Sequence, residues 1–191
     1  MILPIVPYGN TTLRQQCSNI TSFDDQLNNL IDDMWHTMNK ANGCGLAAPQ
    51  VNKPINLFIV DTIASYQMLD NQSREELFAT QDTGIEETFI NARIIDRSGN
   101  SWSELEGCLS IPGLSQQVKR PWSITIEYYN RNNIRQVKTF EGYTARVIQH
   151  EYDHLEGKLY IDHLSRLSHK LLHRKLKRIV NRQVVTDYPM L

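Results

Sequence analysis

The sequence predicts an α+β domain in which antiparallel β-sheets pack around a central helix, with one further helix near each end of the chain. Segments with the alternation and β-branched content of strands follow one another between Thr88 and Gly142. Segments with helical periodicity lie before and after this run rather than between its strands, which is typical of an α+β domain. At 191 residues, the chain is expected to form one domain over residues 1–191.

The first helix is predicted from Asp24 to Ala41, where apolar residues recur at the spacing of a helix that buries one face. Ser22 is the candidate N-cap, with Asp25 three residues later, and Asn42-Gly43 ends the helix. The short apolar run Ile55–Asp61 then predicts a buried strand. The apolar positions of the helix are Leu27, Leu30, Ile31, Met34, Trp35, Met38 and Ala41.

The polar stretch from Thr62 to Glu87 predicts a loop with a short helix near residues 73–78. Strand patterns follow at 88–96 (TFINARIID), 122–130 (WSITIEYYN) and 134–142 (IRQVKTFEG). The residues between the last two, Arg131-Asn132-Asn133, favour a hairpin turn. We therefore expect these strands to pair antiparallel.

Two helices are predicted after the strands. The central helix is expected at Tyr143–Glu156, where Gly157 stops it. A basic C-terminal helix is expected at about 165–182. Its apolar residues, which we expect to pack inward, are Leu167, Leu171, Leu172, Leu176 and Ile179.

Charge and composition restrict the class of protein. Residues 165–191 carry seven Lys or Arg and one acid, a net +6, which leaves −7 on residues 1–164. The N-terminal MILPIVPYGN lacks the positive region of a secretory signal, and no apolar run is long enough to span a membrane. Three widely spaced cysteines argue against a disulfide framework, so we expect a cytoplasmic protein without a membrane partner.

The stretch QHEYDH contains the most informative chemical pattern. In a helix, His150 and His154 lie one turn apart on one face and can bind one metal ion. Glu151 beside them can take a proton from a water that the ion activates. Gln149 and Asp153 are candidate partners that orient the imidazoles. The alternative is that two surface histidines fell four residues apart by chance.

A catalytic metal site needs a third ligand from elsewhere in the chain. Downstream, where HExxH proteases take theirs, the candidates are His163, His169 and His173. Upstream, Cys108 in EGCLSIPG offers a thiolate, which is a strong, soft ligand, although a free cysteine is more often a small buried residue. The residues alone leave both directions open.

The stretch GCGLAAPQ, residues 43–50, is poor in side-chain atoms. Backbone with so few side-chain atoms suits a segment that another molecule must approach closely. The alternative is a helix C-cap followed by a tight turn.

Taken together, GCGLAAPQ, EGCLS and QHEYDH resemble, in order and spacing, the three motifs of the peptide deformylases, GxGxAAxQ, EGCxS and HExDH. The runs ILPIVPYGNTTLR and GYTARVIQHEYDHLEGKLYIDHLS are also similar to that family, so the resemblance covers most of residues 1–170. It implies a metal-dependent hydrolase that removes the formyl group from the N-terminal formylmethionine of newly made polypeptides and releases formate. The alternative function is that of an HExxH-type metallopeptidase.

The resemblance also implies a role for each matching residue. Cys108, His150 and His154 match the metal ligands, and Glu151 matches the general base. The metal implied is one divalent ion, Fe²⁺ in the cell, which Zn²⁺, Ni²⁺ or Co²⁺ can replace.

Gln50 and the backbone N–H of Leu109 match the groups that stabilise the oxyanion. The substrate-binding segment implied is Gly43, Cys44 and Gly45, although the family normally has Val or Ile where Cys44 stands.

Arg120 falls where the family has an arginine that supports the site, with Glu106 as its candidate partner. The partners implied are N-formylmethionyl nascent peptides. The basic C-terminal helix is either a solvated amphipathic helix or a contact to ribosomal RNA. We expect a monomer that binds no DNA.

Overall fold

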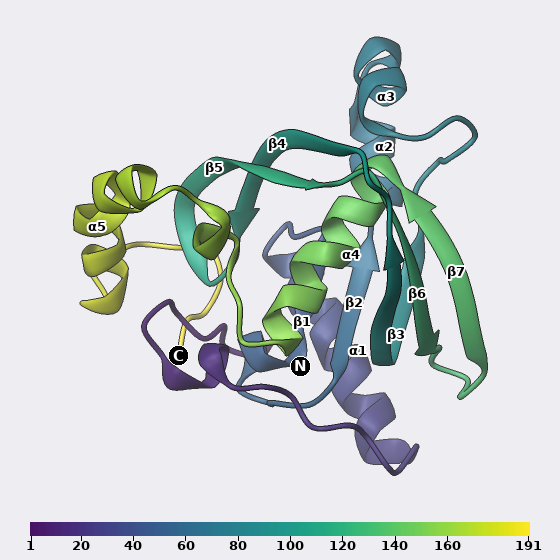
Figure 1. Ribbon diagram of the computed structural model, residues 1–191. Coiled ribbons are helices and arrows are strands. Elements are labelled where there is room, and N and C mark those ends of the chain that lie inside the picture. Colours follow the sequence, from purple (N-terminus) through teal and green to yellow (C-terminus); the bar gives the residue numbers. More distant parts are fainter.

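The computed structural model describes the whole chain, residues 1–191. Five α-helices and three short 3-10 helices accompany seven strands (Figure 1). The helices are α1 (Asp25–Lys40), α2 (Ile63–Met68), α3 (Asn71–Leu77), α4 (Gly142–Leu155) and α5 (Arg166–Val180), with 3-10 helices η1 (Thr11–Arg14), η2 (Ala48–Val51) and η3 (Tyr160–His163). The strands are β1 (Gly45–Ala47), β2 (Leu57–Asp61), β3 (Glu86–Arg97), β4 (Ser101–Cys108), β5 (Ile111–Pro121), β6 (Ser123–Tyr129) and β7 (Arg135–Glu141).

The strands form two antiparallel sheets. One has five strands in the order β1-β2-β3-β6-β7, and the other is the two-stranded β4-β5 hairpin. Helix α4 lies between the two sheets, and α1 lies on the far side of the larger sheet (Figure 1). The predicted α+β class with a central helix is therefore confirmed.

Strand β2 shows how the larger sheet holds both helices. Side chains alternate between the two faces of a strand. Phe58 and Val60 pack with Ala145 and Ile148 of α4, while the intervening positions of β2 pack on the α1 side. Because α4 is covered by both sheets, most of its side chains are buried, the polar ones included. A polar side chain in that position needs a partner within the protein.

Helix α1 is correctly predicted, but its cap is not Ser22. The Asp24 side chain accepts a hydrogen bond from the N–H of Leu27 at 3.0 Å, and the Ser22 hydroxyl donates to Asp24 at 2.9 Å. Asp24 is the N-cap because its carboxylate reaches the free N–H groups of the first turn, and Ser22 orients that carboxylate.

Other differences from the prediction concern short or curved elements. Strands β1, β4 and β5 were not predicted. In the polar stretch, α3 corresponds to the short helix predicted near residues 73–78, whereas α2 was not predicted. The predicted hairpin turn at residues 131–133 does join β6 to β7.

The C-terminal helix α5 buries fewer leucines than predicted. Leu172, Leu176 and Ile179 form the stripe that packs on the body of the protein. Leu167 and Leu171 lie off that stripe and are 70% and 74% exposed, so the prediction that both pack inward is wrong.

None of the helices combines the length and the apolar character that a membrane span requires.

Candidate active site

Three side chains from two elements form a cluster at the centre of the molecule. His150 and His154 lie one turn apart on α4, and Cys108 ends β4. One ligand atom from each lies within 4.8 Å of the other two, and Cys108 Sγ is 3.3 Å from His154 Nε2. All three residues of the predicted ligand set are therefore brought together.

The downstream histidines are not part of this cluster. His163 Nε2 lies 2.8 Å from Asp153 Oδ2, which is a hydrogen-bonding distance. His169 and His173 lie on α5. Of the candidates for a third ligand, only Cys108 is placed beside both histidines of the motif.

Glu106, also on β4, orients one of the predicted ligands, His150. Its Oε2 lies 3.0 Å from His150 Nδ1, which leaves the other ring nitrogen of His150 free. The carboxylate also accepts two hydrogen bonds from Arg120, at 2.6 and 2.9 Å, so the expected pairing of these two residues is present. Although burial opposes it, the hydrogen bonds from His150 and Arg120 hold the pKa of Glu106 far below its ordinary value.

The expectation that Gln149 and Asp153 orient the imidazoles is wrong. Gln149 donates to the carbonyl oxygens of Pro121 and Ala145. Asp153 accepts from Arg120 at 2.8 Å instead. Neither side chain forms a hydrogen bond with a ring nitrogen of His150 or His154.

Arg146 is a residue of the site that sequence analysis missed. It is 1% exposed and donates to Glu106 at 2.5 Å and to the carbonyl of Val118 at 2.9 Å. Its guanidinium also lies over the ring of Trp102, 4.3 Å from the ring centroid. The available signal was an arginine within a helix predicted to be central, because a charge that such a helix buries requires a partner.

Glu151 is buried beside the cluster, and one of its oxygens is free. Its Oε2 is buried without a hydrogen-bond partner. Burial raises the pKa of Glu151 to about 7. A carboxyl group that titrates near neutral pH can both accept and return a proton.

Gly45 makes this position of Glu151 possible. A β-carbon at residue 45 would lie 2.5 Å from Oε1 of Glu151. The alternative interpretation of GCGLAAPQ as a helix cap and tight turn is therefore incomplete, because Gly45 belongs to strand β1 and its missing side chain leaves space for the carboxylate.

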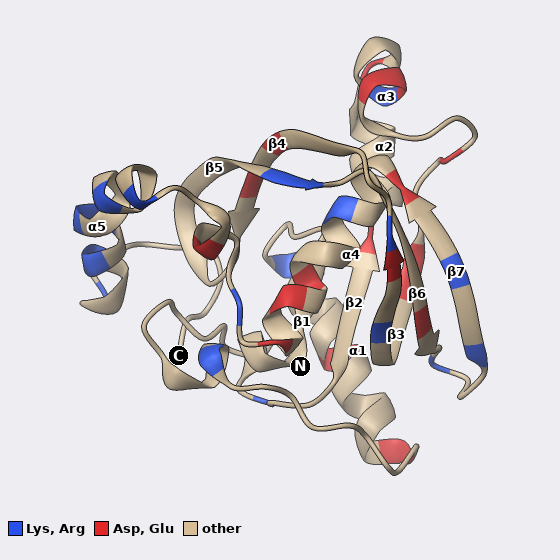
Figure 2. Ribbon diagram, in the orientation of Figure 1, with Lys and Arg blue, Asp and Glu red and all other residues tan.

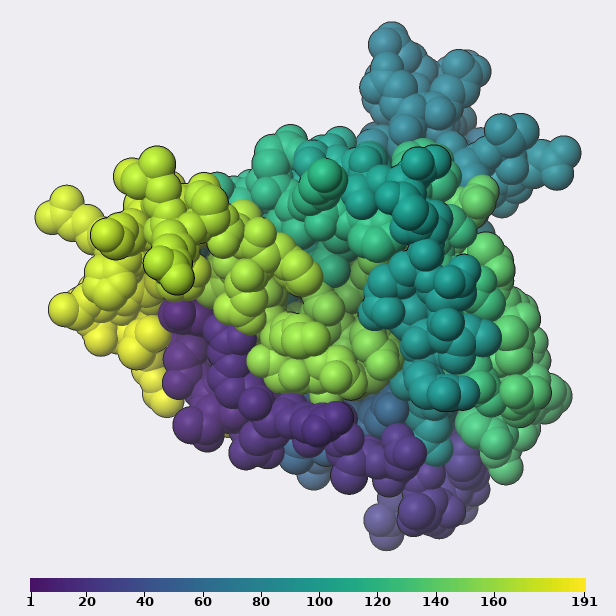
Figure 3. Space-filling model, viewed as in Figure 1, coloured from purple at the N-terminus to yellow at the C-terminus, as the bar shows by residue number.

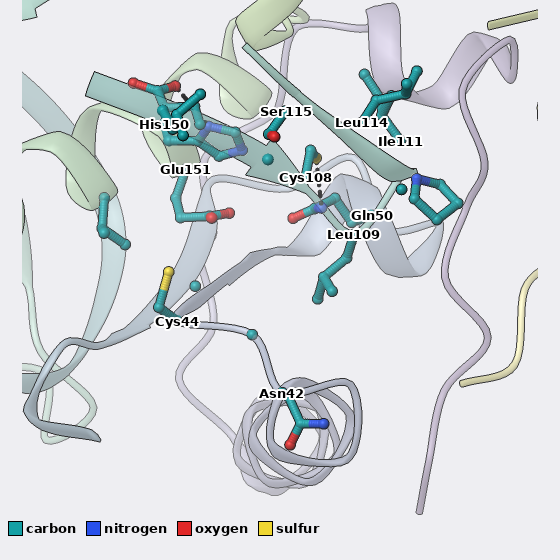
Figure 4. A pocket seen from close by; sticks show the side chains of 18 of the residues that line it. Asn42, Cys44, Gln50, Cys108, Leu109, Ile111, Leu114, Ser115, His150 and Glu151 are labelled. Carbon is teal, nitrogen blue, oxygen red and sulfur yellow. Dashed lines mark hydrogen bonds and ion pairs between the residues drawn. The ribbon is translucent and has the colours of Figure 1, made fainter. Parts of the chain in front are cut away.

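Gln50 presents the donor end of its amide to the same space. Its Oε1 accepts from the N–H of Ala47 at 2.8 Å, which directs Nε2 toward Cys108 Sγ and Ser110 Oγ, each 3.4 Å away. Figure 4 shows this amide facing Cys108, with His150 and Glu151 around the same space.

These groups open into a cavity of about 580 Å³. The predicted substrate-binding residues Gly43, Cys44 and Gly45 line it, together with Leu109. The Tyr143 hydroxyl donates to Cys44 Sγ at 3.7 Å, and burial raises the pKa of that thiol. Cys44 therefore presents a protonated, weakly polar group to the cavity.

The cluster suits a divalent transition metal. One sulfur and two imidazole nitrogens are the donors that Zn²⁺, Fe²⁺, Ni²⁺ and Co²⁺ accept. Burial lowers the pKa of His154 well below its ordinary value, which keeps that imidazole neutral as a ligand must be. The contact between His150 and Glu106 is the arrangement that fixes a metal-binding imidazole.

Comparisons of the sequence and of the structure with known proteins point to the same family. The family model described as polypeptide deformylase matches residues 2–170. The peptide deformylase of Flavobacterium psychrophilum is 45% identical over 190 residues, which cover 100% of this chain and 96% of the relative. The solved structure of peptide deformylase from Plasmodium falciparum has a TM-score of 0.79 at 32% identity and covers 93% of this chain and 95% of that one. The structure from Ehrlichia chaffeensis has a TM-score of 0.82 at 27% identity, with 97% and 100% covered.

The fold and the cluster beside a free carboxylate define a metal-dependent hydrolase. The match over most of the chain and the full-length relatives narrow this class to one family. The chain belongs to the peptide deformylases, enzymes that remove the formyl group from an N-terminal formylmethionine.

Proposed function

We propose that this protein deformylates newly made polypeptides in the 580 Å³ cavity, with Glu151 as its general base. One observation carries the assignment of the base. The only carboxylate oxygen that is buried without a partner, Glu151 Oε2, belongs to a side chain that lines the cavity beside the Cys108, His150 and His154 cluster. The metallopeptidase alternative is not favoured, because its third ligand would come from downstream.

Cys108, His150 and His154 would hold the metal, with Fe²⁺ proposed in the cell and Zn²⁺, Ni²⁺ or Co²⁺ as substitutes. The bound ion would supply Lewis acidity toward a water molecule and the formyl oxygen. The carboxylate of Glu106 fixes the orientation of the His150 ring, and Arg120 holds that carboxylate in place.

The residues around the ion divide the remaining chemistry. Glu151 takes a proton from the attacking water and returns it to the nitrogen of methionine as the carbon–nitrogen bond breaks, so that formate and a free amine leave. The Gln50 amide and the N–H of Leu109 stabilise the negative charge on the formyl oxygen. The Leu109 N–H suits this role because it donates to no other group of the backbone.

A narrow cavity wall at Gly43 and Gly45 would select the formyl group over larger acyl groups, because the formyl carbon carries only hydrogen. A β-carbon at residue 43 would lie 2.9 Å from Leu109 Cδ1, and one at residue 45 would collide with Glu151. Gly43 and Gly45 therefore keep the backbone close to the reacting carbon, which leaves little room for a larger acyl group.

Replacing Cys108 by alanine is expected to remove the metal without unfolding the protein. Two imidazoles alone bind a divalent ion weakly, because a catalytic site ordinarily has three protein ligands. The measurement is metal content after gel filtration, compared with Cys17→Ala, a half-buried cysteine outside the cluster. Full metal occupancy in Cys108→Ala would contradict the ligand assignment.

We also propose that α5 contacts ribosomal RNA near emerging chains, in a monomeric protein of the cytoplasm. Basic residues occupy successive turns of α5 (Figure 2), and none of them forms an ion pair within the protein. Their charge is available to phosphates, and the exposed Leu167 and Leu171 add an apolar surface beside them.

Such a contact is expected to weaken steeply as salt rises, since it depends on phosphate charge. The test is cosedimentation with ribosomes of the whole protein and of Lys170→Glu/Arg174→Glu, two exposed positions on one face of α5. Equal cosedimentation of both proteins would refute the contact.

A further inference from the structure

The last residues of the chain return to the active site. After α5 ends at Val180, the segment 183–191 crosses to the cavity, where residues 185–188 form part of its lining. This segment lies beyond residues 2–170, the part that the family model matches. The motifs that predicted the site therefore say nothing about it.

Tyr188 is the residue of this segment that reaches the catalytic groups. Its hydroxyl donates to the carbonyl oxygen of Leu109 at 2.8 Å, and its ring is partly buried against the α1 side of the core. Leu109 lies in the turn between β4 and β5, directly after the ligand Cys108. A hydrogen bond to one carbonyl of a two-residue turn restricts the rotation of the adjoining peptide groups, including the one that carries the Leu109 N–H.

Pairing with the start of the chain holds Tyr188 in place. The N–H of Ile5 donates to the carbonyl of Pro189, and the N–H of Leu191 donates to the carbonyl of Ile5, both at 2.9 Å. Ile5 is completely buried. Figure 3 shows the N-terminal segment, in purple, beside the yellow C-terminal segment on the surface.

The same N-terminal segment is bonded to both sides of the oxyanion site. The N–H of Val6 donates to the carbonyl of Gln50, and the N–H of Tyr8 donates to the carbonyl of Ser110, each at 2.8 Å. The two chain ends thus form a bracket of backbone hydrogen bonds around the two proposed oxyanion donors, and Tyr188 connects this bracket to Leu109.

We propose that Tyr188 is a positioning residue for catalysis, which fixes the Leu109 peptide so that its N–H points at the oxyanion. The proposal rests on the proposed function, because it needs Leu109 as a donor. Charge on the formyl oxygen is larger in the transition state than in the bound substrate, so a misaligned donor costs more in kcat than in KM.

The test is Tyr188→Phe, which removes one hydroxyl and keeps the ring. We expect kcat for a formyl-Met tripeptide to fall about threefold to tenfold, the range for one neutral hydrogen bond, while KM and metal content stay unchanged. The matched control is Tyr129→Phe, a partly buried tyrosine of β6 that does not line the cavity. An unchanged kcat in Tyr188→Phe, or an equal loss in the control, would overturn the proposal.

A second variant removes residues 189–191 and keeps Tyr188. It loses the pairing with Ile5, so kcat should fall again with metal content unchanged. Wild-type kcat in this variant would show that the bracket does not act on the turn. The two proposals can fail separately: an active Glu151→Gln enzyme would refute the assignment of the base, whereas wild-type kcat in Tyr188→Phe would refute only the positioning role.

Discussion

Glu151→Gln is expected to bind its metal normally and to lose turnover by about a thousandfold. Glutamine preserves the size of the side chain but cannot accept the proton of the attacking water, and general acid–base catalysis contributes typically 10²–10⁴-fold. The carboxylate does not belong to the Cys108, His150 and His154 cluster, so metal content should not change. The measurement is kcat together with metal content.

The matched control is Glu156→Gln, an exposed carboxylate at the end of the same helix. It should keep wild-type turnover. A Glu151→Gln protein with turnover near that of the control would defeat the assignment of Glu151 as the base.

Glu106→Gln is expected to destabilise the fold by about 3 kcal/mol or more, the usual cost of removing one partner from a buried ion pair. Its carboxylate accepts hydrogen bonds from both Arg120 and Arg146, whose side chains are 4% and 2% exposed. A neutral amide would leave Arg146 without its ion-pair partner and Arg120 with Asp153 alone, in a place that water does not reach. The measurement is the free energy of unfolding from denaturant titration of the metal-free protein.

Glu127→Gln provides the comparison for this prediction. Glu127 also pairs with two arginines, Arg93 and Arg135, but those side chains are 71% and 58% exposed. Surface pairs of this kind contribute about 1 kcal/mol or less. Equal destabilisation by the two substitutions would mean that the buried network does not stabilise the fold as described.

The sequence predicts the helices best, because the evidence for a helix lies within a few turns of chain. The apolar spacing of residues 24–41 located α1 within one residue at each end, and the helix predicted at 143–156, with Gly157 as its stop, located α4 equally well. The pair His150 and His154 is similarly local, since helix geometry alone brings the two imidazoles together.

Contacts between distant segments were harder to predict. Strand β4 of the β4-β5 hairpin has a single buried position, so its sequence lacks the alternating apolar pattern of a half-buried strand. The link from Glu106 to Arg146 joins residues 40 positions apart, and that from Tyr188 to Leu109 joins residues 79 apart. Leu167 and Leu171 fit a helical pattern, but only the folded neighbours decide which face of α5 is covered.

The most direct test of the account is formate release from a formyl-Met tripeptide, beside the acetyl-Met analogue, by metal-loaded protein purified without oxygen. We predict formate from the formyl peptide and no acetate from the acetyl peptide, because the narrow wall proposed at Gly43, Gly45 and Leu109 would admit the smaller group only. Absence of formate with metal-replete protein would contradict the proposed function, and equal hydrolysis of both peptides would contradict the basis of its selectivity.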